Sequence, residues 1–272
     1  MITIDIALVS LTVTLAYSPS PRRAQYAACM PVDKPDLGRA LSYFGSKYAT
    51  APRYPEPVHD LIIEPFAGGA GYSLRYWKRN VILIERSPDV CGAWRMILEK
   101  GPDAIRRLPL LRPKDDLRKM LLTTDAKRLI GFWVNTATTS PRNKLSSWAL
   151  DRNQSGESSF WSERTRERLA KLSEAVIGRW KIIHGDYTCA PDIEATWFID
   201  PPYKGALGSH YWGGLSVNFD DLGAWCRARR GQTVVCEQTG ADWLPFVHLA
   251  DVRATSGKFR KGRVNEAIWI NG

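Results

Sequence analysis

Leu61-Ile62-Ile63-Glu64-Pro65-Phe66-Ala67-Gly68-Gly69-Ala70-Gly71 is a short apolar run followed by a glycine-rich turn, and a helical pattern continues over 72–78. The β-branched run predicts a buried strand, which Glu64-Pro65 ends. Glycines between a strand and a helix let a ligand approach the backbone, because no side chain blocks the way. Together these parts are typical of the first strand, turn and helix of an α/β sheet.

Five more apolar runs predict strands, at 81–84, 181–183, 196–199, 233–236 and 266–270. Helical patterns separate several of these runs, which indicates a parallel α/β sheet. An acidic residue stands at or just after the carboxyl end of four of the predicted strands: Glu64, Glu85, Asp186 and Asp200. Ligands bind at this edge of an open parallel sheet, so these carboxylates are candidates for a site.

A long stretch, residues 95–180, separates the second and third predicted strands and is rich in Arg, Lys, Trp, Ser and Thr. Residues 162–179 within it have the apolar spacing of a helix. A crossover between parallel strands needs only one helix, so the extra length indicates another purpose. We interpret 95–180 as an insertion in a domain formed by 30–94 and 181–272. Residues 1–29 are expected to be an extension outside the core, which either lies upstream of the natural start or forms a loose tail.

The composition is that of a folded protein with a basic surface. Of the 272 residues, 44% are hydrophobic and 24% are charged, and the net charge is +10. This charge favours a polyanionic partner, although charge alone does not establish one. The five cysteines form no C-x-x-C pair and the four histidines no H-x-x-x-H, so we expect no metal, no disulfide framework and a reduced, cytoplasmic setting. The apolar run near the N-terminus is too short to span a bilayer, and no membrane association is expected.

The acidic residues of the first two predicted strands favour a cationic ligand over a dinucleotide. Glu64 stands directly before the glycine turn, where a carboxylate would repel a pyrophosphate. S-adenosylmethionine carries a sulfonium, an ammonium and a ribose diol, each of which attracts a carboxylate. Glu85 stands where a carboxylate can accept hydrogen bonds from both ribose hydroxyls. A purely structural turn and a solvated strand end remain the alternatives for these two features.

Asp200-Pro201-Pro202-Tyr203, at the end of an apolar strand, is the most informative motif. The lone pair of an aromatic amine is delocalised into its ring, so the amine is a poor nucleophile. A carboxylate and a backbone carbonyl can accept hydrogen bonds from the amine and restore electron density at nitrogen. Two prolines stiffen the loop, and the tyrosine ring can stack on a base. The alternative is an ordinary loop, in which the two prolines only end the strand.

In its order along the chain, this set of motifs resembles that of the Dam-type (D12 class) DNA adenine-N6 methyltransferases. The matching parts are Y-F-G-S-K at 43–47, E-P-F-A-G-G-A-G at 64–71, Glu85, G-D at 185–186, D-P-P-Y at 200–203 and a basic, then acidic, segment at 258–266. Ala70 departs from the pattern, because the family often has a glycine at this position. The resemblance covers about 41–272, and the insertion matches the family only in its location.

The resemblance implies a Rossmann-like, seven-stranded methyltransferase fold with a helical target-recognition insertion at 95–180. It implies direct methyl transfer from S-adenosylmethionine to N6 of a flipped adenine in double-stranded DNA. The cofactor contacts expected from it are Tyr43, Lys47, Glu64, Phe66, Gly68, Glu85, Asp186 and Asp200. The expected catalytic residues are Asp200, Pro201, Pro202 and Tyr203. Asp200 would touch both the cofactor and the amine, and Tyr203 would stack on the adenine.

Basic residues predict nucleic-acid contacts at two places, and solvated surface charge is the alternative at both. Arg142 and Lys144 lie among short polar residues of the kind that contact phosphates and base edges. Near the C-terminus, four charges fall within six residues: Lys258, Arg260, Lys261 and Arg263. We expect double-stranded DNA as the partner and a monomer in solution.

Other functions stay open at this point. Methylation of adenine N6 in RNA or of cytosine N4 in DNA would use the same loop, because both substrates present an amine. A non-catalytic, methyltransferase-like DNA-binding module would keep the fold, but the presence of Asp200, Tyr203 and Glu85 argues against it. A nicotinamide-dependent oxidoreductase lacks a clean G-x-G-x-x-G here and leaves D-P-P-Y unexplained. Attack by a cysteine on cytosine C5 is not expected, since the chain has no Pro-Cys dipeptide.

Overall fold

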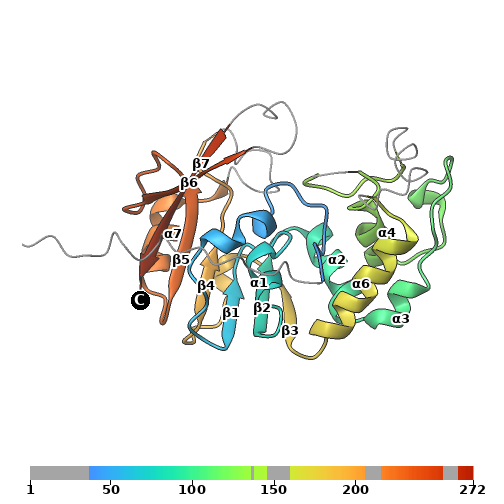
Figure 1. Ribbon diagram of the computed structural model, residues 1–272, viewed down its shortest axis with the longest axis horizontal. Coiled ribbons are helices and arrows are strands. Elements are labelled where there is room, and N and C mark those ends of the chain that lie inside the picture. Colours follow the sequence, from blue (N-terminus) through green and yellow to red (C-terminus); the bar gives the residue numbers. More distant parts are fainter. Residues whose placement is uncertain (1–36, 136–137, 146–159, 206–215, 254–262, 272) are drawn as a thin grey trace, which may run out of the picture. The chain divides into compact units, whose positions relative to one another are not determined.

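The computed structural model describes residues 37–135, 138–145, 160–205, 216–253 and 263–271. Within these residues the chain has an α/β fold around a seven-stranded mixed sheet (Figure 1). The strands are β1 (Leu61–Glu64), β2 (Asn80–Glu85), β3 (Trp180–His184), β4 (Thr196–Ile199), β5 (Thr233–Gln238), β6 (Val247–Arg253) and β7 (Arg263–Asn271). Their order across the sheet is β3-β2-β1-β4-β5-β7-β6. The residues predicted as an N-terminal extension lie outside the described part.

The six apolar runs predicted as strands are confirmed, and two features of the sheet differ from the prediction. The five strands β1 to β5 are parallel, but β7 is antiparallel to both β5 and β6. The sheet is therefore mixed and not parallel throughout. β6 was not predicted, because it is an edge strand with a weak apolar pattern, and its first residue, Val247, is 60% exposed.

The chain changes direction across the sheet at β1. From β1 it runs outward through β2 to β3, and it then returns to β4 on the other side of β1. The connections that leave the carboxyl ends of β1 and β4 therefore diverge. In open α/β sheets a ligand binds in the crevice at such a point. The glycine turn after β1 and the D-P-P-Y loop after β4 both lie at this edge.

Alternating residues of the central strands face two separate hydrophobic clusters. In β1, Ile62 belongs to the larger cluster and Ile63 to the smaller one, and in β4 Phe198 and Trp197 divide in the same way. This follows from the two-residue period of a strand, which points successive side chains to opposite faces. Both faces of the sheet are therefore covered, as parallel strands require.

The helices of the described residues begin either at a side chain that caps their first backbone N–H groups or without such a cap. They are α1 (Gly71–Arg75), α2 (Pro88–Leu98), α3 (Gly101–Arg106), α4 (Thr124–Gly131), α6 (Glu163–Val176) and α7 (Phe219–Arg227), with short 3-10 helices η1 (Lys47–Ala49), η2 (Ala51–Arg53), η3 (Leu117–Lys119) and η4 (Tyr187–Cys189). The side chains of Ser87, Thr123, Ser162 and Asn218 cap α2, α4, α6 and α7. The helix predicted over 162–179 ends earlier, because Gly178 takes a positive φ of 82°.

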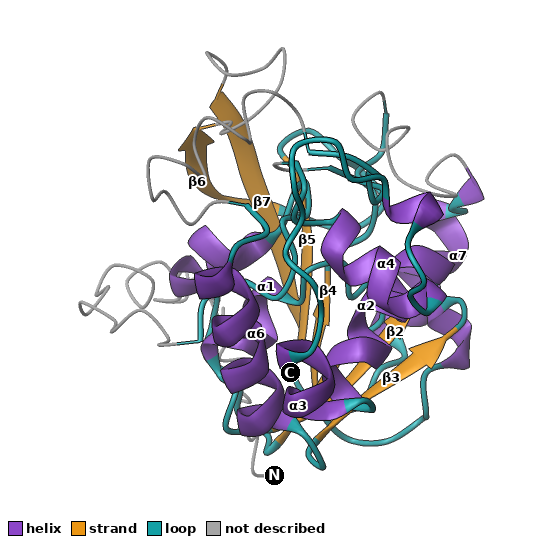
Figure 2. Cartoon of the chain, turned by 90° about the vertical axis from the view of Figure 1, so that its right-hand side faces the viewer, coloured by secondary structure: helices purple, strands orange, loops and turns teal. Residues whose placement is uncertain are grey.

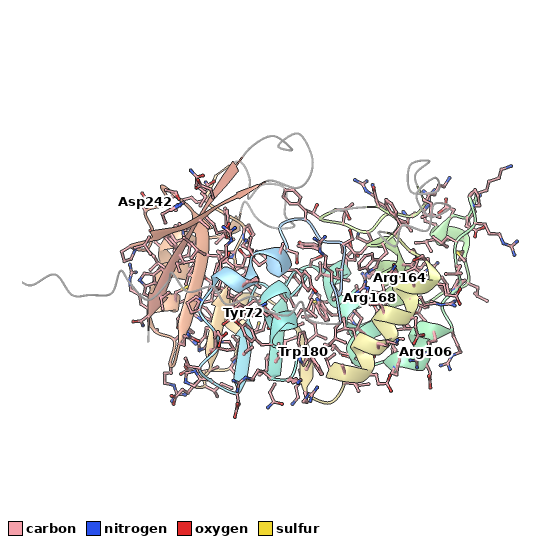
Figure 3. All side chains as sticks on the ribbon, in the orientation of Figure 1. Tyr72, Arg106, Arg164, Arg168, Trp180 and Asp242 are labelled. Carbon is pink, nitrogen blue, oxygen red and sulfur yellow. The ribbon has the colours of Figure 1, made fainter. Side chains whose placement is uncertain are left out.

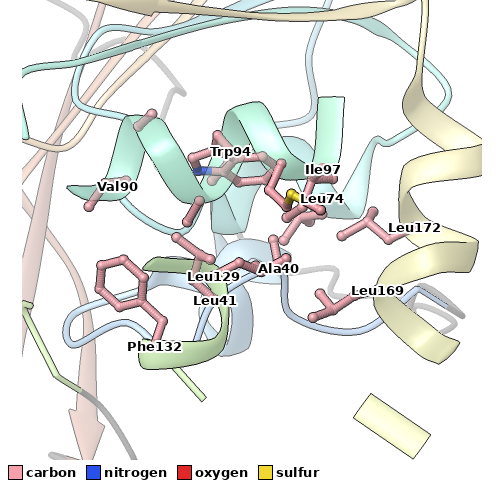
Figure 4. Packing of buried hydrophobic residues seen from close by; sticks show 14 of the residues in the cluster. Ala40, Leu41, Leu74, Val90, Trp94, Ile97, Leu129, Phe132, Leu169 and Leu172 are labelled. Atoms are coloured by element: carbon pink, nitrogen blue, oxygen red, sulfur yellow. The ribbon is translucent and has the colours of Figure 1, made fainter. Parts of the chain in front are cut away.

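The helices between β2 and β3 share the main core with the sheet. Trp94 on α2, Leu129 on α4 and Leu169 on α6 pack in one cluster with Leu74 of α1 (Figure 4). Figure 2 shows α3 and α6 side by side, and the two helices are in contact. Arg168 of α6, labelled in Figure 3, donates a hydrogen bond to Leu37 O at 3.0 Å. Among the described helices, none is both long and apolar enough to cross a membrane.

Candidate active site

The turn after β1 is held tightly by backbone contacts and by unusual dihedral angles. Ala67 N donates to Ile84 O of β2 at 3.0 Å, which ties the turn to the neighbouring strand. Gly68 has a φ of +46°, and Ala70 has a φ of 47°. Ala70 is the one described residue other than glycine with a positive φ, so the position where the sequence departs from the family pattern is one that favours glycine.

Carboxylates occupy the N–H groups that a glycine turn would otherwise offer to an anion. Gly68 N donates to Glu85 Oε2 at 2.9 Å, and Ser73 N in α1 donates to Glu64 Oε1 at 2.7 Å. Both donors lie at the turn and in the first helix, where dinucleotide-binding proteins hold pyrophosphate. Glu85 therefore places a carboxylate at the turn, which suits a cation.

Glu64, one of the expected cofactor contacts, is bonded within the protein. Its side chain is buried, only 2% exposed, and it supports the start of α1 through Ser73 N. Burial raises the pKa of Glu64 to about 8. Glu64 therefore stabilises the junction between the turn and α1.

Residues 43–48 cover the glycine turn closely. A Cβ added at Gly68 would lie 3.0 Å from the Tyr43 ring, and one added at Gly71 would lie 2.2 Å from Tyr48 N. The same segment is joined to the region between β2 and β3, because Tyr43 forms an isolated parallel bridge with Thr138. Tyr43 and Lys47, predicted from the same motif, are thus placed against the turn predicted as the cofactor site.

Lys47, at the start of η1, lies between two acidic side chains from different parts of the chain. Its Nζ is 2.8 Å from Asp200 Oδ1 and 3.4 Å from Glu266 Oε1. Asp200 directly follows β4, and Glu266 lies in β7. All three side chains are mostly buried, with exposed fractions of 11% for Lys47, 19% for Asp200 and 5% for Glu266. An ion cluster this enclosed is costly to form unless its members pair.

The D-P-P-Y loop is fixed on both sides of Tyr203. The Tyr203 hydroxyl donates to Glu266 Oε1, and Lys47 Nζ lies 4.7 Å from the centre of the Tyr203 ring. The next residue, Lys204, donates its N–H to Glu237 Oε2 at 3.1 Å. Pro201 is buried and Pro202 is half-buried. The loop is therefore rigid at the positions that would hold an amine and a ring.

The ionisation of Asp200 is set by opposing influences. Burial raises its pKa, the ammonium of Lys47 lowers it and the carboxylate of Glu266 raises it, so that the pKa of Asp200 is raised to about 6. Burial lowers the pKa of Lys47, but Asp200 and Glu266 more than offset it, so its pKa is raised above the ordinary value. At neutral pH the pair is a carboxylate and an ammonium.

The other predicted cofactor contacts lie at the ends of β2 and β3. Glu85 accepts hydrogen bonds from Gly68 N and, at 2.8 Å, from Ser87 N. Phe66 of the turn stacks on Tyr187 of η4, with ring centres 5.6 Å apart. Asp186 caps η4 by accepting from Thr188 N. These contacts bring the ends of β1, β2 and β3 together around one edge of the sheet.

The predicted nucleic-acid contacts are only partly described. Arg142 and Lys144 are exposed, in a loop whose Arg142 N donates to Gly131 O at the end of α4. Lys144 Nζ lies 3.6 Å from Asp116 Oδ2, so its charge is partly neutralised. Lys258, Arg260 and Lys261 lie outside the described residues, and of Arg263 only the backbone, at the start of β7, is described.

Three contributors to the site were not predicted as site residues. Glu266 and Tyr54 meet at the ion cluster, where Tyr54 OH donates to Glu266 Oε1 at 2.6 Å. Trp94 of α2 donates its ring N–H to Gly68 O at 2.8 Å and so fixes the turn from another side. A signal existed for Glu266, because a carboxylate within the apolar run V-N-E-A-I-W-I needs buried partners.

No cluster of three or more His, Cys, Asp or Glu side chains in the described residues is arranged to hold a metal ion. The arrangement instead offers an acidic sheet edge, a glycine turn whose Gly68 N–H is already bonded to Glu85, and a rigid loop with a paired carboxylate. A scan against protein-family models and a search of curated proteins both gave no match to the chain.

Proposed function

We propose that the chain is a DNA methyltransferase of the Dam type (D12 class), which transfers a methyl group from S-adenosylmethionine to N6 of adenine in double-stranded DNA. The observation that carries this proposal is the contact between Lys47 and Asp200, 2.8 Å apart although 153 residues separate them in the chain. Through Lys47, the D-P-P-Y loop lies beside the segment that covers the glycine turn. Group transfer requires such proximity between the donor site and the acceptor site.

The donor groups at this edge fit S-adenosylmethionine better than a cofactor with phosphates. Glu85 accepts a hydrogen bond from Gly68 N at Oε2 and from Ser87 N at Oε1. Each carboxylate oxygen has a second lone pair, which can accept from a ribose hydroxyl. Phe66 and Tyr187 add an aromatic surface for an adenine ring, and Asp186 adds negative charge nearby. A pyrophosphate would meet these carboxylates with like charge.

When bound, S-adenosylmethionine supplies an electrophilic methyl group, whose bond to sulfur breaks as the new bond to nitrogen forms. Asp200 has one oxygen, Oδ1, bonded to Lys47, while Oδ2 accepts no hydrogen bond from the described residues. Oδ2 is therefore the acceptor for an N–H of the target amine, and drawing on that hydrogen increases electron density at nitrogen. The methylated nitrogen then gives up one proton, which the Asp200 carboxylate accepts and passes to solvent.

The helical region between β2 and β3 is proposed as the target-recognition part. Its exposed Arg142 and Lys144 suit phosphate contacts, and its Thr138 pairs directly with Tyr43 next to the turn. The net charge of +10 supports a polyanionic substrate. Extruding a base from the duplex would bring its amine to the rigid loop.

The test is to incubate the protein with methyl-labelled S-adenosylmethionine and, in parallel reactions, duplex DNA or RNA, then to digest the nucleic acid and identify the labelled nucleoside. We expect N6-methyl-2′-deoxyadenosine. Label in N4-methylcytosine, or in RNA alone, would assign the enzyme to the neighbouring amine-methylating class. Cofactor binding without any transfer would indicate a non-catalytic module, and absence of cofactor binding by calorimetry would refute the proposal.

A further inference from the structure

Glu266 is a buried carboxylate in the interior of the sheet. It lies in β7, which is flanked by β5 and β6 (Figure 1), and only 4% of the residue is exposed. Its strand neighbours Ala267 and Ile268 are buried and apolar. A charge in such a position costs free energy unless several hydrogen-bond donors meet it. The hydrogen-bond donors around Glu266 therefore indicate which groups this carboxylate positions.

One oxygen of Glu266 gathers three groups from separate parts of the chain. Oε1 accepts from Tyr54 OH at 2.6 Å and from Tyr203 OH, and it lies 3.4 Å from Lys47 Nζ. Burial raises the pKa of both tyrosines, so their hydroxyls keep the protons that they donate. Two of the three groups, Tyr203 and Lys47, directly flank Asp200.

A second buried carboxylate, Glu237, already supports the backbone of the D-P-P-Y loop. The contacts of Glu266 with Tyr203 and Lys47 are therefore not needed for that support alone. Glu237 of β5 accepts from Lys204 N and, at 3.0 Å, from Trp243 Nε1. In the β5–β7 pairing Glu237 lies opposite Ala267, and Glu266 lies opposite Gln238, so the two carboxylates point to opposite faces of the sheet. Glu237 fixes the backbone after the loop, whereas Glu266 fixes the Tyr203 ring and the Lys47 ammonium.

We propose that Glu266 is a positioning residue for methyl transfer: through the Tyr203 hydroxyl and the Lys47 ammonium, it holds the stacking ring and the Asp200 carboxylate in their working geometry. This inference rests on the proposed methyl-transfer function. Without Glu266, Tyr203 loses the acceptor of its hydroxyl, and Lys47 pairs with Asp200 alone. Displacing a reacting group by about 1 Å costs on the order of a hundredfold in rate.

The charge of Glu266 also acts on Asp200, which gives a readout that a structural role would not change. Glu266 raises the pKa of Asp200 and Lys47 lowers it. Five more titratable groups surround Asp200, and burial raises the pKa of each: Tyr54, Glu64, Tyr203, Cys236 and Glu237. Asp200 must be ionised to accept a hydrogen bond from the amine, so the rate falls as the pH drops through about 6. Removing the negative charge of Glu266 moves this fall to lower pH.

The experiment compares Glu266→Gln with wild type in single-turnover methyl transfer to duplex DNA, at saturating S-adenosylmethionine, across this pH range. Glutamine keeps an acceptor oxygen for the tyrosine hydroxyls but loses the charge that faces Lys47 Nζ. We therefore expect a rate lower by about ten- to a hundredfold, a cofactor dissociation constant within a few-fold of wild type, and an acid limb displaced to lower pH. A folded variant with the wild-type rate and the wild-type acid limb overturns the inference and leaves the proposed function intact. A wild-type protein that transfers no methyl group overturns both.

Tyr203→Phe keeps the test decisive if Glu266→Gln does not fold, since it removes the hydroxyl contact and leaves the ring. Its matched control is Tyr72→Phe, which removes another buried tyrosine hydroxyl. That hydroxyl donates to Pro55 O at 2.7 Å and not to the D-P-P-Y loop. We expect Tyr203→Phe to lower the transfer rate at least tenfold, and Tyr72→Phe to keep the wild-type rate. Equal rates for the two variants would contradict the role given to Glu266.

Discussion

Gly71 and Ala70 are adjacent in the glycine turn, yet the turn places different demands on them. Gly71 has no room for a side chain, because an added Cβ would lie 2.2 Å from Tyr48 N. Ala70 has a side chain but adopts a left-handed conformation with a φ of 47°. At the first position a methyl group would push the covering segment away, and at the second it adds strain that glycine would remove.

Gly71→Ala is therefore expected to lower the free energy of unfolding by about 1–3 kcal/mol and to abolish S-adenosylmethionine binding, because Lys47 and Tyr43 lie on the displaced segment. The matched control is Ala70→Gly, which removes the left-handed strain but increases the conformational entropy of the unfolded chain. Because these two effects oppose each other, its free energy of unfolding should stay within about 1 kcal/mol of wild type. Chemical denaturation and calorimetry measure both variants. Unchanged stability and cofactor binding in Gly71→Ala would contradict the close packing of the turn.

At the scale of elements, the first helix depends on a carboxylate beneath it. α1 has only five residues, and Glu64 accepts from the N–H of Ser73 within it. The pKa of Glu64 is raised by burial to about 8, against an ordinary value of 4.5. A raised pKa in the folded state means that the protonated form is favoured by folding. The contribution of Glu64 to stability is thus complete below pH 4.5 and is lost as the pH rises through about 8.

Glu64→Gln cannot ionise but keeps a carbonyl oxygen for Ser73 N. Relative to wild type, its free energy of unfolding should therefore improve steadily between pH 5 and pH 8. Glu64→Ala leaves a buried N–H without an acceptor and should cost about 1–3 kcal/mol. Urea unfolding at a series of pH values measures the difference. A constant difference between Glu64→Gln and wild type over this range would show that Glu64 does not titrate as its burial implies.

The strands were the most predictable elements, because a buried parallel strand is a continuous apolar run. Thr196–Ile199 is buried at every position, and such a run has few alternatives once prolines follow it. β6 escaped prediction because an edge strand needs only one apolar face. The direction of β7 was also beyond prediction, since an apolar run looks the same in a parallel and an antiparallel strand. The helix expected over 72–78 ends at Arg75, since its apolar pattern continued into a turn.

At the scale of the whole molecule, the candidate site is an assembly of distant segments. The sequence could indicate that Lys47 and Asp200 belong to one site only through motif order, whereas the structure places them in contact. Glu266 was predicted only as part of a closing motif, because its role depends on Tyr54, Tyr203 and Lys47 meeting at one oxygen. The spacing of these residues in the sequence does not indicate that they contact one carboxylate oxygen. Local chemistry was predictable, and long-range pairing was not.

We expect particular basic residues, Arg142 and Lys144 among them, to contact DNA, beyond the general effect of the net positive charge. Replacing both Arg142 and Lys144 by Gln should weaken binding to duplex DNA and reduce the slope of log K against log salt by roughly 0.9 for each lost phosphate contact. Cofactor binding should not change. The control replaces Lys78 and Lys181, which are exposed near the amino ends of β2 and β3, and removes the same charge away from the site. Equal salt slopes for the two double variants, from fluorescence anisotropy, would show that only net charge matters.

The most direct measurement is the single-turnover rate of methyl transfer by Asp200→Asn, with cofactor affinity measured on the same preparation. The side chain keeps its volume but loses the negative charge that pairs with Lys47 and accepts from the amine. We predict a rate lower by about 10²- to 10⁴-fold, with S-adenosylmethionine binding only weakened and the protein still folded. A folded Asp200→Asn enzyme that methylates DNA at nearly the wild-type rate would contradict the role of Asp200 in the chemistry.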